Sequence, residues 1–440
     1  MRQGSSNAVS LDRLDRSALE ALQQASLRHL LVDFLPKSEF YAAKLAGINT
    51  ASIKSAVGLK GLPFTTKTEL LADQETHPPY GRNLTQALAH YSRIHQTSGT
   101  AGKPLRWLDT PSNWKWMLDC WELLYRIARV QQDDRLFFAF SFGPFLGFWT
   151  AFEAASREGY FCLPAGGMSS RARLQLLLEN KATIVLCTPT YALRLAEVAR
   201  EEKIDLASSS VRMLIVAGEP GGSIPATRAR IESAWGARVL DHSGLTEVGP
   251  VAIECPENPV GLHILESEYI AEVLSFSRDP QGSEHATPTP RGELGELILT
   301  NLGRTDSPLL RYRTGDLVRI DPAPCPCGRS LLRLAGGIFG RADDMISIRG
   351  NNFYPTALEA IIRGVPEVAE YRVEVDRTGS LARLLIEVEA TPEASLPEVV
   401  NQVARLIDQE LLFKAEVRGV TSGSLPRFEM KSRRVVQAGS

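Results

Sequence analysis

The chain has 440 residues, long enough for two or three domains and a large hydrophobic core. A hydrophobic fraction of 44%, a charged fraction of 23% and a formal net charge of −2 are typical of a globular protein, and they give no electrostatic reason to expect nucleic acid or an anionic membrane as a partner. No apolar run approaches the length of a membrane span, and the N-terminus carries no apolar signal core. Six cysteines do not suggest a disulfide framework in a chain of this length. We therefore expect a cytoplasmic protein with reduced thiols.

The first stretch with distinct chemistry is "TSGTAGKP", residues 97–104. Its glycines allow backbone N–H groups to approach a ligand, its hydroxyls add donors, and Lys103 adds a point charge, a combination that suits a polyphosphate. An ordinary surface turn is the alternative. Only two residues separate the glycines, so the loop matches neither G-x-x-x-x-G-K-[ST] nor G-x-G-x-x-G, and a nucleotide would be held in another fold.

The middle of the chain alternates between strand-like and helix-like segments. Residues 181–190 and 211–222 are short apolar runs, and the segments 191–204 and 223–235 that follow them have helical spacing. Another apolar run leads into "DHSGLTEVG" at residues 241–249. This alternation predicts an α/β domain with a mostly parallel sheet, whose ligands lie in the loops after the strands.

Four metal-ligand residues are spread over the next part of the chain: Cys255, His263, Cys325 and Cys327. A Cys/His/Cys/Cys set is a reasonable tetrahedral zinc site, and four protein ligands would make the zinc structural rather than catalytic. C-x-C is tighter than the usual spacing, so reduced thiols in a turn are the alternative.

The pattern changes after about residue 340. Residues 371–376 and 384–390 alternate between apolar and polar side chains, which predicts half-exposed antiparallel strands. A helix is expected over residues 395–411, with Ser395 and Glu398 at capping-box spacing. We therefore expect a small α+β domain at residues 340–440 after a large domain at residues 1–339.

Taken in order, five segments resemble the motifs of the adenylate-forming superfamily of acyl- and aryl-CoA ligases, peptide-synthetase adenylation domains and luciferases. They are "TSGTAGKP", "GLTE", "RTGDL", "GRADDMI" and "LPRFEMK". The N-terminal "FYAAKLAGI" and "LKGLPFTTKTELLAD", together with the later "CPCGRSLLRLAGGIFGRADDMI", are similar to phenylacetate–CoA ligases. Some proteins of that type also carry Cys and His residues at the places of the four described above.

The resemblance implies an aryl-CoA ligase that uses ATP, Mg²⁺ and coenzyme A. The acid's carboxylate attacks the α-phosphorus of ATP to give an acyl adenylate, and the thiol of coenzyme A then displaces AMP. Thr246 is expected at the α-phosphate, Glu247 on Mg²⁺, and Lys431 between the carboxylate and the α-phosphate. The other ATP-binding residues implied are Thr97, Ser98, Gly99, Thr100, Gly102, Lys103, Gly218, Glu219, Pro220, Asp241, His242, Ser243, Asp316 and Arg341.

In this superfamily the small domain rotates between the two steps. Asp343 occupies the hinge position, and Gly350 would lie beside the pantetheine tunnel after rotation. One position departs from the family pattern, because Ser243 stands where an aromatic residue usually stacks on adenine.

The aryl-acid pocket is expected around the run "FFAFSFGPFLGFW". Aromatic walls favour an aromatic ligand, although core packing gives the same composition. The candidate pocket residues are Phe140, Phe142, Phe145, Ala217, His242 and Gly244. A benzoate such as anthranilate fits this composition as well as phenylacetate does, and the crowded run slightly favours the shorter acid.

Two alternatives stay open from the sequence. The first is a stand-alone adenylation protein that loads the phosphopantetheine of a carrier protein, since that arm is the same as in coenzyme A. The second is an inactive nucleotide-binding module, against which the presence of Glu247, Asp316 and Lys431 argues. The sequence leaves the oligomeric state open.

Overall fold

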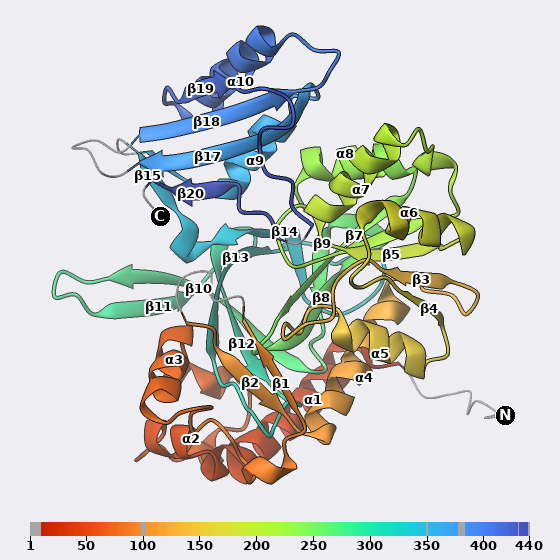
Figure 1. The fold of residues 1–440 in the computed structure, drawn as a ribbon. Coiled ribbons are helices and arrows are strands. Elements are labelled where there is room, and N and C mark those ends of the chain that lie inside the picture. The colour runs from red at the N-terminus through yellow and green to blue at the C-terminus, as the bar shows by residue number, and fades with distance from the viewer. Residues whose placement is uncertain (1–9, 98–102, 349–350, 377–382, 430, 439–440) are drawn as a thin grey trace. The chain divides into compact units, whose positions relative to one another are not determined.

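The computed structural model describes residues 10–97, 103–348, 351–376, 383–429 and 431–438 (Figure 1). The chain divides into two compact units, of which unit 1 contains residues 1–167 and 240–337 and unit 2 contains residues 168–239 and 338–440. The chain passes between the units after Gly167 and within strands β7 (Arg238–Leu245) and β14 (Arg333–Arg341). The expected domain boundary near residue 340 stays a prediction.

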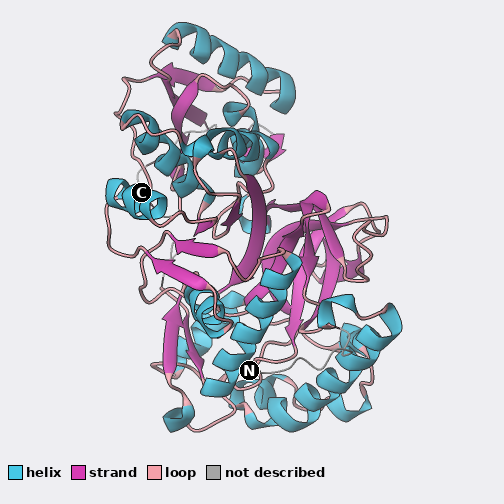
Figure 2. Ribbon diagram, turned by 90° about the vertical axis from the view of Figure 1, so that its right-hand side faces the viewer, coloured by secondary structure: helices cyan, strands magenta, loops and turns pink. Residues whose placement is uncertain are grey.

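Unit 1 combines helices with mainly antiparallel strands (Figure 2). Its helices are α1 (Arg16–His29), α2 (Glu39–Lys44), α3 (Lys67–Thr76), α4 (Pro111–Ile127) and α5 (Trp149–Arg157). Its further strands are β1 (Arg93–Gln96), β2 (Arg106–Asp109), β3 (Arg135–Phe138), β4 (Phe161–Pro164), β8 (Gly249–Cys255), β9 (Asn258–Ile264), β10 (Tyr269–Arg278), β11 (Glu284–Pro288), β12 (Leu294–Asn301) and β13 (Tyr312–Ile320). Among the described residues, no helix is long and apolar enough to cross a membrane.

The strands of unit 1 correct the expectation of a mostly parallel sheet. Among the strand pairs described there, β3–β4 is parallel, whereas β7–β8, β8–β9, β9–β14 and the series β11–β10–β12–β13 are all antiparallel. The physical reason is the length of the connections. Two residues link β8 to β9, and a connection that short can join only antiparallel strands.

Unit 2 contains the predicted α/β alternation. Strands β5 (Ile184–Cys187) and β6 (Met213–Val216) are fully buried and pair in parallel, as expected. The helices of this part are α6 (Ser170–Glu179), α7 (Pro189–Glu201) and α8 (Pro225–Trp235). A strand whose side chains are all apolar must be buried on both faces of its sheet. The helices that connect β5 and β6 to the next elements provide this cover, and a helical connection allows neighbouring strands to run parallel.

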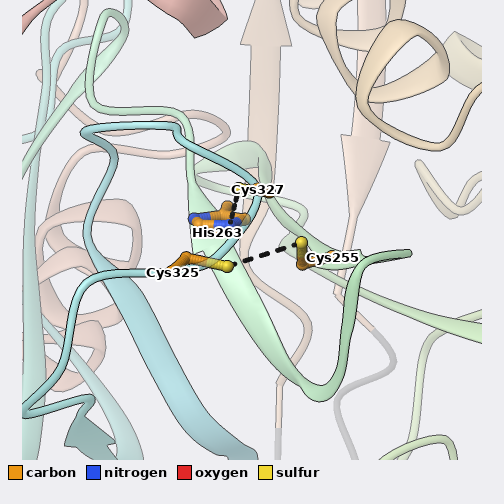
Figure 3. Close-up of side chains that lie close together, drawn as sticks. All are labelled: Cys255, His263, Cys325 and Cys327. Atoms are coloured by element: carbon orange, nitrogen blue, oxygen red, sulfur yellow. Dashed lines mark hydrogen bonds between the residues drawn. The ribbon is translucent and has the colours of Figure 1, made fainter.

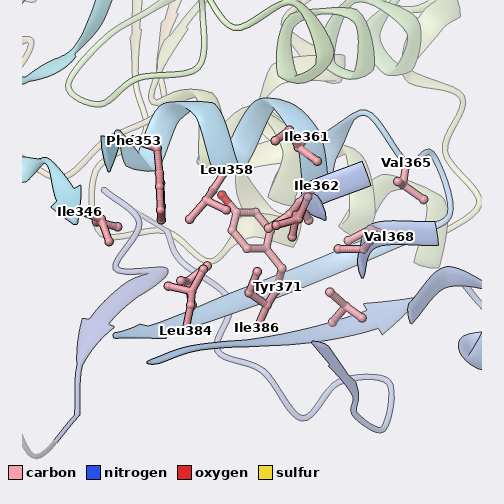
Figure 4. Packing of buried hydrophobic residues seen from close by; sticks show 14 of the residues in the cluster. Ile346, Phe353, Leu358, Ile361, Ile362, Val365, Val368, Tyr371, Leu384 and Ile386 are labelled. Carbon is pink, nitrogen blue, oxygen red and sulfur yellow. The ribbon is translucent and has the colours of Figure 1, made fainter. Parts of the chain in front are cut away.

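The C-terminal part of unit 2 has its own core, formed by buried residues between Ile346 and Phe413 (Figure 4). Its strands are β15 (Ile346–Ile348), β16 (Asn351–Phe353), β17 (Val368–Asp376), β18 (Arg383–Ala390), β19 (Glu416–Gly419) and β20 (Val435–Gln437), and its helices are α9 (Pro355–Arg363) and α10 (Leu396–Leu411). The sheet order is β19–β18–β17–β20, with β17 and β18 antiparallel as predicted. In Figure 4, Leu358 and Ile362 of α9 point toward Tyr371 on β17.

Helix α10 begins at the predicted place, but the predicted capping box is absent. Ser395 is the N-cap residue and its side chain makes no capping hydrogen bond. The helix is instead held by packing, because Val399, Val403 and Ile407 are buried along one face.

Candidate active site

Glu247 lies in the turn between β7 and β8 and is 3% exposed. The hydroxyl of Tyr312, the first residue of β13, donates to Glu247 Oε1 at 2.6 Å. An ionised carboxylate offers about four acceptor sites, so the phenol fixes the side chain and leaves capacity for a cation. The geometry therefore fits the expected magnesium ligand.

The backbone of the same turn is hydrogen-bonded to one member of a buried ion pair. Arg304 Nε and Nη2 donate to the two oxygens of Asp109, each at 2.7 Å, and both side chains are 0% exposed. Arg304 Nη1 donates to the carbonyl oxygen of Thr246 at 2.7 Å. Asn301 Nδ2 adds a hydrogen bond of 2.8 Å to the carbonyl oxygen of Val248. The backbone on each side of Glu247 thus has a fixed position.

Residues expected in a loop before this turn lie in strand β7 instead, which corrects the prediction for Asp241, His242, Ser243 and Gly244. The strand continues to Leu245 because it pairs with β8 across a bulge between Ser243 and Gly244. Ser243 is half-buried.

His242 is held neutral by its surroundings. Burial lowers its pKa to about 4. Nδ1 lies 2.8 Å from the carbonyl oxygen of Ala252, which can only accept, so Nδ1 carries the proton and Nε2 is an acceptor. Its ring lies 4.5 Å from that of Trp121.

Aromatic rings continue from His242 into the predicted pocket run. Phe148 lies 6.1 Å from Trp121 and 5.2 Å from Phe140, and Phe140 lies 4.8 Å from Phe142, as measured between ring centroids. Phe148 is buried core, whereas Phe140 and Phe142 are half-buried. Phe145 is 37% exposed. The aromatic wall exists, and its use as an acid pocket stays a prediction.

The expected phosphate loop is described only at its two ends. Thr97 donates its N–H to the carbonyl oxygen of Leu105, and Thr97 Oγ1 accepts from the N–H of Leu105, both at 3.0 Å. Lys103 is exposed and pairs with Glu75 at 3.0 Å. The expected phosphate-binding residues Ser98, Gly99, Thr100 and Gly102 lie outside the described residues.

Asp316, the expected ribose ligand, lies on β13 four residues after Tyr312. The pairing of β13 with β12 shifts register between Glu296 and Ile298, and Gly315 adopts φ +77°, which favours glycine. This irregularity sets the direction of Asp316, whose N–H donates to Thr314 Oγ1 at 3.0 Å.

Unit 2 carries the predicted adenine loop, catalytic lysine and hinge. A Cβ placed on Gly218 would lie 3.4 Å from Lys431 Cε, so the predicted adenine loop and the predicted catalytic lysine are neighbours. Glu219 joins the same group, since it accepts the N–H of Ser432 at 2.6 Å. Ala217 is buried, and its N–H donates to the carbonyl oxygen of Cys187. Pro220 is exposed.

The predicted ribose arginine and hinge acid pair with each other. Arg341 Nε and Nη2 donate to Asp343 at 3.0 and 3.3 Å, and both side chains are partly exposed. Gly350 lies outside the described residues.

The four expected zinc ligands come together in unit 1 (Figure 3). Their ligand atoms all lie within 4.8 Å of one another, with Cys255 Sγ 3.6 Å from Cys325 Sγ and Cys327 Sγ 3.4 Å from His263 Nε2. Tetrahedral zinc with Zn–S bonds of about 2.3 Å separates its ligand atoms by about 3.7 Å. The donor set therefore fits zinc in type and in spacing.

Two members of this cluster have pKa values shifted toward the metal-binding form, whereas burial raises the pKa of the Cys255 thiol. Burial lowers the pKa of His263 to about 4, which gives the neutral imidazole that metals require. Burial opposes ionisation of Cys327, but hydrogen bonds from Arg329 and the neighbouring thiols outweigh it and lower the pKa of that thiol.

Each unit thus contains its own part of the predicted site, and unit 1 also contains residues that the sequence did not reveal. Tyr312 stands one residue before "RTGDL", and a polar side chain next to a motif is a signal that could have identified it. Asp109 and Arg304 are 195 positions apart, and no local pattern connects them.

The chain is similar to known proteins over almost its full length. The model of the AMP-binding enzyme family matches residues 20–298, and that of the AMP-binding enzyme C-terminal domain matches residues 350–438. The phenylacetate-coenzyme A ligase of Thermus thermophilus is 32% identical over 97% of this chain and 98% of its own length. That of Escherichia coli is 32% identical over 95% of this chain and 94% of its own.

A solved structure of similar fold is that of 2-hydroxyisobutyryl-CoA ligase in the postadenylation state with 2-HIB-AMP. It is 28% identical, with a TM-score of 0.88 over 97% of this chain and 91% of that one. The same ligase has also been solved with 2-HIB-AMP and CoA in the thioesterification state, and that structure gives a TM-score of 0.71.

Proposed function

The chain belongs to the AMP-binding enzyme family, and we propose that it is an ATP-dependent ligase that joins a small aromatic carboxylic acid to coenzyme A. The observation that carries this conclusion is its alignment over nearly the whole chain with phenylacetate-coenzyme A ligases. In the first step a carboxylate oxygen bonds to the α-phosphorus of ATP and pyrophosphate leaves. In the second step the sulfur of coenzyme A bonds to the acyl carbon, the thiol loses its proton, and AMP leaves.

We assign three residues to the reacting groups. Lys431 places a cation between the carboxylate and the α-phosphate, two anions that repel each other until they are bridged. Thr246 contacts the α-phosphate, and the fixed backbone of its turn supports this role. Glu247 holds Mg²⁺, which shields the phosphate charge during attack.

Apart from Glu219, which is treated below, the remaining ATP contacts are proposed on the residues that match the family motifs. Lys103 exchanges its exposed partner Glu75 for phosphate, and Asp316 accepts from the ribose hydroxyls. The C-terminal domain, residues 340–440, then rotates about Asp343 between the steps.

The substrate is proposed to be phenylacetate or a benzoate such as anthranilate. The ring series from Trp121 to Phe142 supports an aromatic acid, because aromatic rings stack favourably on one another. We place the neutral His242 beside the carboxylate of the acid substrate. An uncharged imidazole does not form an ion pair with that carboxylate, which leaves it available to Lys431.

We also propose a structural zinc at Cys255, His263, Cys325 and Cys327, on the fit of donor type and spacing described above. The metal would clamp the β8–β9 hairpin to the loop before β14 and take no part in the reaction. Because thiolate ligands must be reduced, the site also supports a cytoplasmic location.

The test is a mass-spectrometric assay with ATP, Mg²⁺ and CoA on phenylacetate, benzoate, anthranilate, salicylate and 2-hydroxyisobutyrate. An aryl-CoA product supports the proposal and names the acid. Conversion of 2-hydroxyisobutyrate alone would contradict the aromatic substrate. Adenylate that accumulates equally with and without CoA would favour a carrier-protein acceptor, and no adenylate from any acid would favour a nucleotide-binding module.

The role of Lys431 has its own test. Lys431→Ala should abolish ATP–pyrophosphate exchange and leave the reaction of synthetic acyl adenylate with CoA nearly unchanged, because the lysine acts only where two anions meet. Lys414→Ala, which removes an exposed lysine of the same unit, is the matched control and should behave as wild type. Unchanged exchange in Lys431→Ala would contradict the assignment.

A further inference from the structure

The carboxylate of Glu219 joins two segments of unit 2 that are far apart in the sequence. Glu219 Oε1 accepts the N–H of Thr190 at 2.9 Å, and Glu219 Oε2 accepts the N–H of Ser432 at 2.6 Å. Thr190 lies in the first turn of α7, where backbone N–H groups have no partner within the helix. The helix terminus therefore fixes Glu219, and Glu219 in turn fixes the backbone next to Lys431.

The residue before Glu219 contacts the same lysine. Gly218 adopts φ +95°, a conformation that favours glycine. A Cβ placed there would lie 3.4 Å from Lys431 Cε, so the aliphatic part of the lysine runs along this backbone. Gly218 thus lies against the side chain of Lys431, and Glu219 binds the peptide N–H that follows it.

The ends of the segment that carries Lys431 have separate anchors. Arg427 pairs with Glu197 of α7 at 3.1 Å and with the buried Glu389 at 2.7 Å. Arg434 pairs with Glu370 at 2.7 Å. These anchors hold the segment three or four residues away from the lysine, whereas Glu219 acts on the adjacent peptide.

We propose that Glu219 is a positioning residue for Lys431, setting where the ammonium group stands during adenylation. Its two oxygens accept backbone N–H groups, one of them from the peptide that follows Lys431, so we place its action on the reaction through the lysine. The inference rests on the proposed role of Lys431 in the first step. Its consequence is that loss of Glu219 slows adenylation and spares thioester formation.

Two variants test this inference. Glu219→Ala removes both acceptors, and Glu219→Gln keeps the shape and one acceptor oxygen. Glu219→Ala should lower kcat for ATP–pyrophosphate exchange with phenylacetate about tenfold or more, because a charged hydrogen bond that positions the lysine is lost. Glu219→Gln should lower it less. The KM for ATP and the reaction of synthetic phenylacetyl adenylate with CoA should stay as in wild type.

A double variant separates positioning from direct binding. In a Lys431→Ala background, Glu219→Ala should add little further loss, because residues that act as a unit are not additive. A raised KM for ATP with unchanged kcat, or a full additional loss in the double variant, would overturn the proposal and make Glu219 an ATP contact. An equal loss in both half-reactions with a lowered Tm would make its role only structural and would also overturn it.

A measurement that needs no substrate keeps the inference separate from the proposed function. Hydrogen exchange of a peptide spanning residues 425–434 should speed up in Glu219→Ala, since the Ser432 N–H loses its acceptor. Glu202→Ala removes the same charge from the end of α7, where Glu202 pairs with Arg171, and should leave exchange and kinetics unchanged. If wild type forms no adenylate with any acid the proposed function fails, and if Lys431→Ala proves fully active the role of Lys431 fails, whereas unchanged hydrogen exchange in Glu219→Ala refutes the positioning role itself.

Discussion

At the scale of single residues, the turn that carries Thr246 and Glu247 is positioned by side chains from a later part of the chain, residues 301–312. Tyr312 holds the carboxylate, and Arg304 and Asn301 hold the backbone. These contacts are made before any ligand arrives, so little reorganisation is needed when a cation or phosphate binds.

The first prediction concerns Tyr312. Tyr312→Phe removes the hydroxyl that donates to Glu247, so the carboxylate loses its fixed orientation. We expect the Mg²⁺ concentration that gives half-maximal adenylation to rise about tenfold or more, the effect of one lost hydrogen bond to a charged group. Tyr125→Phe is the control, because that buried hydroxyl donates to the carbonyl oxygen of Ala151 instead. An unchanged Mg²⁺ dependence would refute the role of Tyr312.

The second prediction concerns the Arg304–Asp109 pair. Asp109→Leu leaves a buried, unpaired guanidinium, and removal of one partner of such a pair costs about 3–5 kcal/mol of unfolding free energy. Arg304→Met together with Asp109→Leu removes both charges and should recover most of that loss, as measured by urea unfolding.

The same experiment needs a surface pair for comparison. Lys115→Met breaks the exposed pair with Asp119 and should cost no more than about 1 kcal/mol. If Asp109→Leu is equally mild, the buried pair does not stabilise the turn.

At the scale of elements, the strand ends and irregularities place the functional groups. Strand β7 continues through Ser243 because it pairs with β8, although its sequence looks like a loop. The irregularity at Gly315 directs Asp316. Both features arise from pairing with a neighbouring strand, which a single segment of sequence does not contain.

The third prediction concerns the element that zinc would join. The purified protein should contain about one zinc per chain, and Cys327→Ser should lower both the metal content and the Tm, since the metal links the β8–β9 hairpin to the loop before β14. Cys162→Ser, which changes a half-buried thiol outside the cluster, is the control. A metal-free protein whose Tm is insensitive to chelators would contradict the site.

At the scale of the whole molecule, buried histidines link stability to pH. Burial lowers the pKa of His242 to about 4, below the value of about 6.5 for an unfolded chain. The unfolded state therefore binds a proton that the folded state does not bind between these values, so stability is full above about pH 6.5 and falls as the pH drops toward 4.

The fourth prediction follows from this sign. Lowering the pH from 7 to 5 should reduce the unfolding free energy of both proteins. We expect the reduction in His242→Asn to be about 2 kcal/mol smaller than the reduction in wild type, as measured by urea unfolding at both pH values. His29→Asn changes an exposed histidine and should show the wild-type difference. Identical pH dependence in wild type and His242→Asn would refute the buried, neutral state of His242.

The sequence by itself determined the local elements and the chemistry of the motifs. The segments that became β5, α7, β6 and α8 were predicted in order, as were β17, β18 and α10, because hydrophobic periodicity reports which face of a single element is buried. The four candidate metal-ligand residues are also identified from their side-chain chemistry, and the structure places their ligand atoms within 4.8 Å of one another.

Only the tertiary structure decided what surrounds these groups. Several features depend on residues far apart in the chain. They are the antiparallel strands of unit 1, the place of Ser243 within a strand, the partners Tyr312 and Arg304, and the contact of Glu219 with Ser432. Periodicity and spacing report local preferences. Register, ion pairing and hydrogen bonding between distant segments are instead set by the free-energy cost of leaving a buried polar group without a partner in the folded chain.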